Sequence, residues 1–65
     1  MSLGTDFPDE IARVHDVLAI YEKHDKAGFG TRMVRDVLIR AKKAQADGDV
    51  VAMLKSWQEM KEVST

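Results

Sequence analysis

The residues of this chain that could do chemistry on a substrate or hold a metal are its two histidines, together with its serines and aspartates. His15 and His24 are nine residues apart in a stretch with helical periodicity, so they do not share a helix face in the i, i+4 manner of zinc-binding helices. The chain has no cysteine to complete a site. No Ser–His–Asp set has a meaningful spacing, and 65 residues leave little volume for a catalytic pocket. We therefore expect no enzyme activity, no metal and no cofactor.

A glycine-rich turn at residues 28–32 has the chemistry of an anion site. Two glycines free backbone amides there, and a helix start followed by Arg32 attracts negative charge. The segment lacks the lysine and spacing of a P-loop and the third glycine of a dinucleotide-binding fingerprint. Helix capping explains the same residues: Gly28 in the left-handed conformation, Phe29 packed back on the first helix, and Thr31 as N-cap of the second. We favour the capping interpretation.

Positive charge is concentrated in residues 31–46, which hold five basic residues and one acid in a chain of net charge −1. On a helical wheel, four of them lie opposite the apolar stripe: Arg32, Arg35, Lys42 and Lys43. This face could bind nucleic acid or an acidic partner. It is also explained as a solvated face whose charges pair with the acidic segments on either side, and we favour this second interpretation. The near-neutral chain as a whole excludes a general polyelectrolyte binder.

Two isoleucines occur where polar residues are expected. Ile39 falls in the middle of the basic face, and Ile20 falls among Asp16, Arg13 and Lys23 on the first predicted helix. One exposed apolar residue needs no explanation, but two β-branched residues on polar faces predict that at least one is covered by a partner. One face is acidic to mixed and the other basic, so the two could meet across a dimer or within a longer assembly.

Three predicted helices position these residues, at about 7–26, 31–46 and 49–63. Apolar residues recur every three to four positions in each, which indicates amphipathic helices rather than strands. Asp6 is expected to cap the first helix and Asp49 the third, with Gly48 closing the second. The positions predicted to be buried are Ile11, Val14, Val17, Leu18 and Tyr21, then Val34, Val37, Leu38, Ala41 and Ala44, then Val50, Met53, Leu54, Trp57 and Met60.

Length and composition then limit the architecture to one small all-α domain. Residues 1–5 show no periodicity and are expected to be disordered, and residues 6–65 are expected to form a three-helix bundle of antiparallel helices. A domain near this size buries only about 60% of its unfolded surface, and no disulfide can stabilise this one, so dimerisation could complete it. No apolar run is long enough for a membrane span or a signal-peptide core. The lack of cysteine suits the reducing cytoplasm.

The sequence therefore predicts a small, non-catalytic, cytoplasmic interaction protein that self-associates as a homodimer. Its contacts would come from spare apolar residues, namely Ile20, Ile39 and Val51, with the four basic residues of the second helix setting orientation. A protein partner other than a second copy is compatible with the same surface, whereas contact with a membrane is not expected. The alternative prediction is a nucleic-acid-associated accessory factor that uses the basic face of the second helix.

Overall fold

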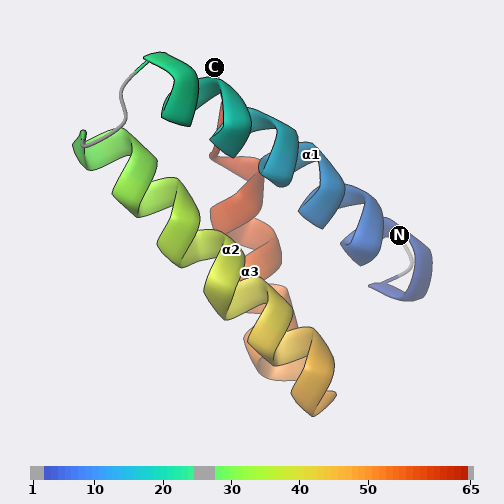
Figure 1. Cartoon of the computed structure of the whole chain (residues 1–65). Coiled ribbons are helices and arrows are strands. Elements are labelled where there is room, and N and C mark those ends of the chain that lie inside the picture. The colour runs from blue at the N-terminus through green and yellow to red at the C-terminus, as the bar shows by residue number, and fades with distance from the viewer. Residues whose placement is uncertain (1–2, 25–27, 65) are drawn as a thin grey trace.

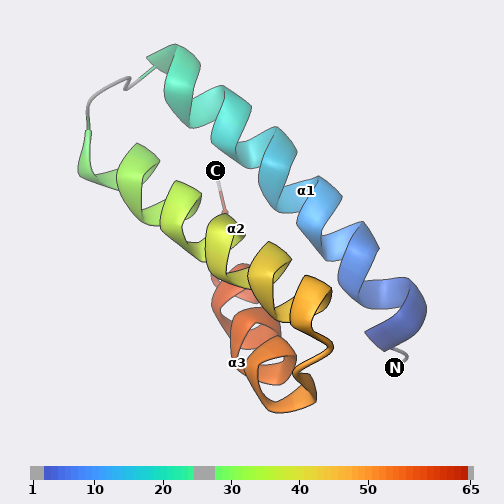
Figure 2. The ribbon, with the colours of Figure 1, turned by 60° about the horizontal axis from the view of Figure 1, so that its bottom comes forward.

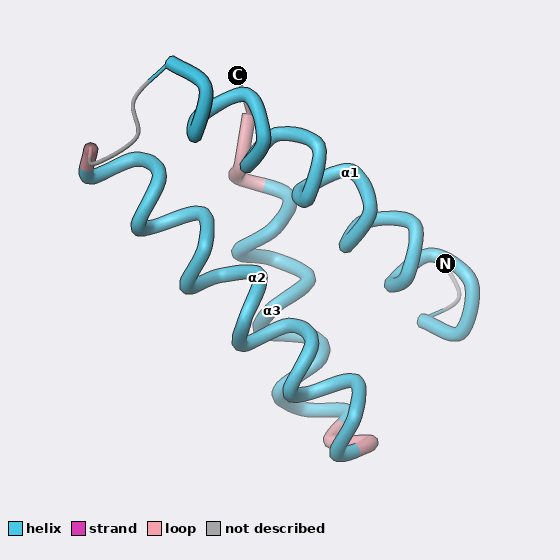
Figure 3. The backbone as a smooth tube through the Cα atoms, viewed as in Figure 1, coloured by secondary structure: helices cyan, strands magenta, loops and turns pink. Residues whose placement is uncertain are grey.

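The computed structural model describes residues 3–24 and 28–64, which form three helices packed against one another (Figure 1). Helix α1 spans Leu3–His24, α2 spans Phe29–Asp47 and α3 spans Val50–Lys61. The chain runs along α1, returns along α2 and turns back again into α3, so consecutive helices are antiparallel (Figures 1 and 2). Figure 3 shows no strand in this described part. The predicted all-α three-helix bundle is confirmed.

The core is built mainly from the stripes predicted for the first two helices. All five positions predicted to be buried in α2 are buried, and those in α1 are buried or pack partly exposed against the core. Phe7 is also completely buried, although it was not among the positions predicted to be buried. Its position was nevertheless visible in the periodicity, because Phe7 lies four residues before Ile11 and seven before Val14 on the same face.

Burial of Phe7 coincides with an earlier start of α1 than predicted. The helix begins at Leu3, so Asp6 lies in its first turn and is not its N-cap, and residues 3–5 are helical rather than part of a disordered end. Pro8 lies inside the helix and leaves one backbone hydrogen bond unmade. The packing of Phe7 and Ile11 on either side offsets this loss. Residues 1–2, and the predicted helix end at residue 26, lie outside the described residues.

The predicted capping arrangement of the first connection is wrong. Gly28 has an extended backbone (φ −78°, ψ 163°) and is itself the N-cap of α2, without a side-chain hydrogen bond. Phe29 is the first helical residue and is 80% exposed, and Thr31 is buried inside the helix. The earlier start brings Gly30 against Tyr21, where a Cβ atom would lie only 3.1 Å from the ring. Glycine there permits a close approach of α1 and α2 that local capping patterns do not reveal.

The second connection is as predicted. Gly48 adopts the left-handed conformation (φ 67°, ψ 24°) and closes α2, with its amide donating to the carbonyl of Gln45 at 3.2 Å. The next amide, of Asp49, donates to the carbonyl of Ala44 at 3.1 Å. The carboxylate of Asp49 in turn accepts a hydrogen bond from the amide of Ala52 at 3.1 Å, and so caps α3. Two residues are therefore enough to reverse the chain.

Helix α3 is rotated relative to the prediction and ends two residues earlier, although Met53, Trp57 and Met60 face the core as predicted. Val50 and Leu54 are exposed, although both were expected in the core. Ala44 of α2 and Ser56 of α3 are small and buried, which lets the two helices approach along this line and rotates α3 relative to its apolar stripe. The α3 side that faces the core carries Met53, Ser56, Trp57, Met60 and, beyond the helix end, Val63.

Candidate interaction surfaces

Seven large apolar side chains of the described residues are 42–80% exposed, and the fold separates them into three surfaces. We name these the turn-end patch (Ile20, Phe29 and Met33, where α1 leads into α2), the outer α2 face (Ile39 and its neighbours) and the α3 patch (Val50, Val51 and Leu54).

On the outer α2 face, the structure places Ile39 among the basic residues as predicted. Ile39 is 57% exposed, and its surface neighbours on a helix are the residues three, four and seven positions away. All of them are exposed, so this face is turned away from the other two helices. The neighbours are Arg32, Arg35, Asp36, Lys42, Lys43 and Ala46.

Ion pairs engage only part of this positive charge. The Nη2 atom of Arg35 lies 2.9 Å from a carboxylate oxygen of Glu22 on α1. The Nζ atom of Lys43 lies 3.3 Å from a carboxylate oxygen of Asp47, one turn along α2. Arg32 and Lys42 form no ion pair within residues 3–24 and 28–64. The cations available to a ligand are therefore chiefly Arg32, seven residues before Ile39, and Lys42, three residues after it.

Ile20 belongs to a different side of the molecule. It is 48% exposed, on the flank of α1 that also carries Arg13 seven residues earlier, and Arg13 reaches the end of α3. Ile39 instead faces away from α1 and α3, so the structure does not bring the two isoleucines together. A contact between the Ile20 side of one copy and the Ile39 side of another would join unlike surfaces, which produces rings or chains rather than a closed two-fold dimer.

The turn-end patch borders a groove that the sequence analysis missed. Helix α3 has 12 residues and α2 has 19, so α3 is shorter by roughly 10 Å. In Figure 2, α3 ends before it reaches the level at which α2 begins. Between the first half of α2 and the end of α3 lies a groove of about 250 Å³, lined by Tyr21, Met33, Val34, Val37 and Val63 with Arg40, Glu59, Glu62 and Ser64.

Tyr21 forms a fixed wall of this turn-end groove. Its hydroxyl donates a hydrogen bond to the carbonyl of Ser64 at 2.9 Å, which ties α1 to the C-terminal segment. Its ring lies against Gly30, where an added Cβ atom would lie 3.1 Å from the ring, so that the ring would have to shift slightly. The groove is therefore already formed in the single chain, and its wall does not have to be assembled when a ligand binds.

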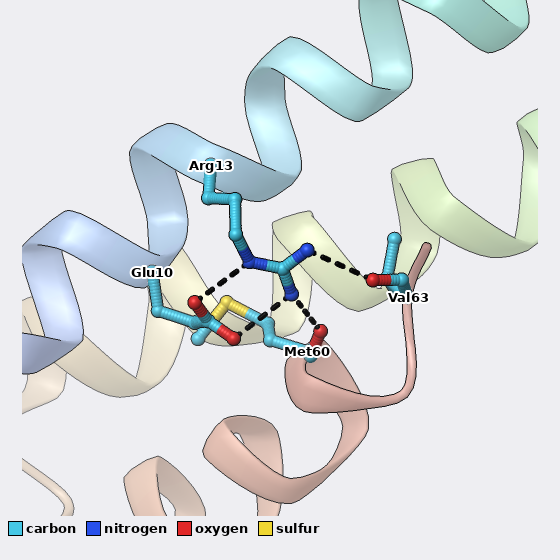
Figure 4. A network of polar contacts seen from close by, with 4 residues as sticks. All are labelled: Glu10, Arg13, Met60 and Val63. Carbon is cyan, nitrogen blue, oxygen red and sulfur yellow. Dashed lines mark hydrogen bonds and ion pairs between the residues drawn. The ribbon is translucent and has the colours of Figure 1, made fainter. Parts of the chain in front are cut away.

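Arg13 holds the end of α3 in place from the side of α1 (Figure 4). Its guanidinium donates to the carbonyls of Met60 at 2.6 Å and Val63 at 2.9 Å, at the helix end where carbonyls lack intrahelical partners. Glu10 accepts two further hydrogen bonds from Arg13, both at 2.9 Å. These bonds lower the pKa of Glu10, against the opposing effect of burial, and raise the pKa of Arg13. The sequence placed Arg13 on a polar face and carried no signal for this long-range role.

A second groove, of about 280 Å³, lies between α2 and α3 near their short connection. Its lining holds three carboxylates and three cations. Two of the cations are already paired, Arg40 with Glu59 and Lys43 with Asp47. This balanced lining favours no charge class of ligand. The lining residues are Arg40, Lys43, Ala44, Asp47, Asp49, Ala52, Lys55, Ser56 and Glu59.

His15 and His24 are both exposed on α1, and no three histidine or carboxylate side chains of the described part are grouped as metal ligands. None of its helices combines the length and apolar character needed to cross a bilayer. The fold and its surfaces thus define a small three-helix bundle with uncovered apolar surface. Comparisons with protein-family models, curated proteins and solved structures gave no match.

Proposed function

We propose that this protein is a non-catalytic helical module that acts by binding protein, in the first place a second copy of itself. The observation that carries the proposal is the turn-end patch: its three large apolar side chains are each about half exposed or more, and one of them, Met33, lines a groove together with Tyr21 and three valines. Patches of this kind on a small domain are typical of interaction sites.

The energetics support an association that depends on concentration. Complete burial of a large apolar side chain contributes roughly 1.5–3 kcal/mol, and the side chains of this patch are already partly buried. Two copies therefore gain a free energy of the same order as the association cost of roughly 4–15 kcal/mol. Because the two terms nearly balance, we expect a weak dimer that forms as the concentration rises toward the millimolar range rather than one that is permanent.

Solution mass tests this proposal directly. We expect light scattering to show a rise from the 7.3 kDa of one chain toward twice that value as the concentration increases from about 1 μM to about 1 mM. The far-UV circular dichroism should remain helical throughout. A mass of one chain at the highest concentration would contradict self-association.

A second candidate function, nucleic-acid binding, is favoured by one observation. Arg32 and Lys42 lie on the outer α2 face without an ion pair in the described part of the chain, so their charge is available to phosphates. Arg35 is less suitable, because Glu22 already accepts a hydrogen bond from it.

This second function predicts retention on DNA or RNA at low ionic strength that falls steeply as salt is added. The double variant Arg32→Glu plus Lys42→Glu should abolish it, whereas the matched pair Lys23→Glu plus Lys55→Glu, also exposed but outside this face, should weaken it less. Lack of retention of the unmodified protein at low salt excludes this function.

A further inference from the structure

We propose that the second copy docks by inserting its Phe29 into the turn-end groove, in a two-fold dimer centred on Met33. This inference rests on the proposed self-association and specifies its geometry. Phe29 is 80% exposed, more than any other large apolar side chain of the described residues. It does not line the groove of its own chain, although Met33, one helical turn further along α2, does.

The groove has the size and lining for an aromatic ring. An apolar cavity of about 150 Å³ can hold benzene in another protein, and the volume here is about 250 Å³. Its walls include Val34, Val37 and Val63, and the ring of Tyr21 supplies an aromatic partner for the incoming phenyl group. A phenylalanine side chain therefore meets apolar atoms on several sides, beside the charged Arg40, Glu59 and Glu62 that also line the groove.

The spacing along α2 explains why a second copy can supply this ring. Phe29 and Val37 are each four residues from Met33, one before it and one after it. If two α2 helices pack antiparallel with the two-fold axis at Met33, each Phe29 lies opposite Val37 of the other copy, in the wall of its groove. The same axis places the two Met33 side chains against each other. The contact uses the same surface on both copies and is therefore closed.

Charges around the contact are complementary. Arg32 lies three residues after Phe29 and has no ion pair in the described part of the chain. Glu62 lines the groove and likewise has none there. Docking of Phe29 brings the Arg32 of one copy to the side of the groove where Glu62 of the other lies, and the two-fold axis repeats this pair. The other two surfaces offer no such combination, since neither Ile39 nor Val51 lines either groove.

Single cysteines test the geometry, because the chain has none of its own. Met33→Cys should form a disulfide-linked dimer on mild oxidation, because the two residues face each other at the axis. Ile39→Cys is the matched control on the same helix, with comparable exposure, and should cross-link at least tenfold more slowly. Both reactions are followed on non-reducing denaturing gels, at a concentration where the unmodified protein has the mass of a dimer.

Phe29→Ala gives an independent measure. It should raise the Kd of the dimer at least tenfold, with unchanged helicity, because Phe29 is mostly exposed in the single chain. If Ile39→Cys cross-links as fast as Met33→Cys, or if Phe29→Ala leaves the Kd unchanged, the docking geometry is wrong while self-association stands. A monomeric mass of the unmodified chain at about 1 mM would overturn both proposals.

Discussion

At the residue scale, two glycines show how backbone and packing requirements differ. Gly48 is required for its conformation: φ is 67°, and a Cβ atom there would meet nothing within 4 Å. Gly30 is required for space, because a Cβ atom would press on the ring of Tyr21. The first requirement is local and readable from a turn between two amphipathic segments. The second depends on which residue of another helix lies opposite.

The conformation of Gly48 leads to a prediction about stability. Gly48→Ala should lower the free energy of unfolding by about 1 kcal/mol, because a side chain is strained in the left-handed region. Gly48→Asn should cost less, since asparagine tolerates this region better. Urea denaturation followed by circular dichroism measures both. Because the space around Gly48 is open, an alanine variant as stable as the parent would show that this backbone conformation is not retained in solution.

At the element scale, α3 depends on what holds its two ends. It has only 12 residues, and isolated helices of this length are marginal in water. Asp49 caps its N-terminus, and Arg13 satisfies carbonyls at its C-terminus while Glu10 orients the guanidinium. Lys61 also lies over the ring of Trp57, 5.3 Å from the ring centre. The end of α3 is therefore fastened to α1 by a charged network that contains a titratable carboxylate.

This network predicts a dependence of stability on pH. The pKa of Glu10 is lowered in the fold below its ordinary value, chiefly by hydrogen bonds from Arg13. Its stabilising contribution is present above that value and is lost as the pH falls through the lowered pKa. At neutral pH, Glu10→Gln should reduce the free energy of unfolding by about 0.5–1 kcal/mol. The difference between variant and parent should shrink as the solution is acidified.

The chain itself offers both a fluorescence probe and a matched control variant for the Glu10→Gln experiment. Trp57 is the single tryptophan and lies on α3, so its fluorescence reports on this helix during denaturation. Asp16→Asn is the matched control, because Asp16 is exposed on the same helix and forms no ion pair in the described part of the chain. A stability difference between Glu10→Gln and the parent that does not change on acidification would contradict the role given to this carboxylate.

At the scale of the whole molecule, the unequal helix lengths decide which surface is left over. The longer pair, α1 and α2, extends past the end of α3, where Glu62, Val63 and Ser64 line one side of the turn-end groove. Ile20 and Met33 therefore stay about half exposed at the turn end. A domain of this size has few ways to gain stability within one chain, so in the proposed dimer a second copy would cover this region and extend the core.

Local pattern was sufficient to predict three helices, the buried stripes of α1 and α2, and the turn at Gly48 and Asp49. These features depend on residues within a few positions of one another, through hydrophobic periodicity and backbone conformation. The basic residues around Ile39 were placed correctly for the same reason, because a helical wheel is enough to group them. The start of α1 was misjudged because Phe7 becomes buried only through contact with the rest of the core.

What the sequence by itself determined is thus the set of helices and the polar and apolar sides of the first two. Only the tertiary structure decided the rotation that exposes Val50 and Leu54, the bonds from Arg13 to the end of α3, and the separation of Ile20 from Ile39. The same is true of the turn-end groove, which residues from all parts of the chain line together. The physical reason is that these features depend on the distances and angles between helices, which long-range packing sets and no local periodicity contains.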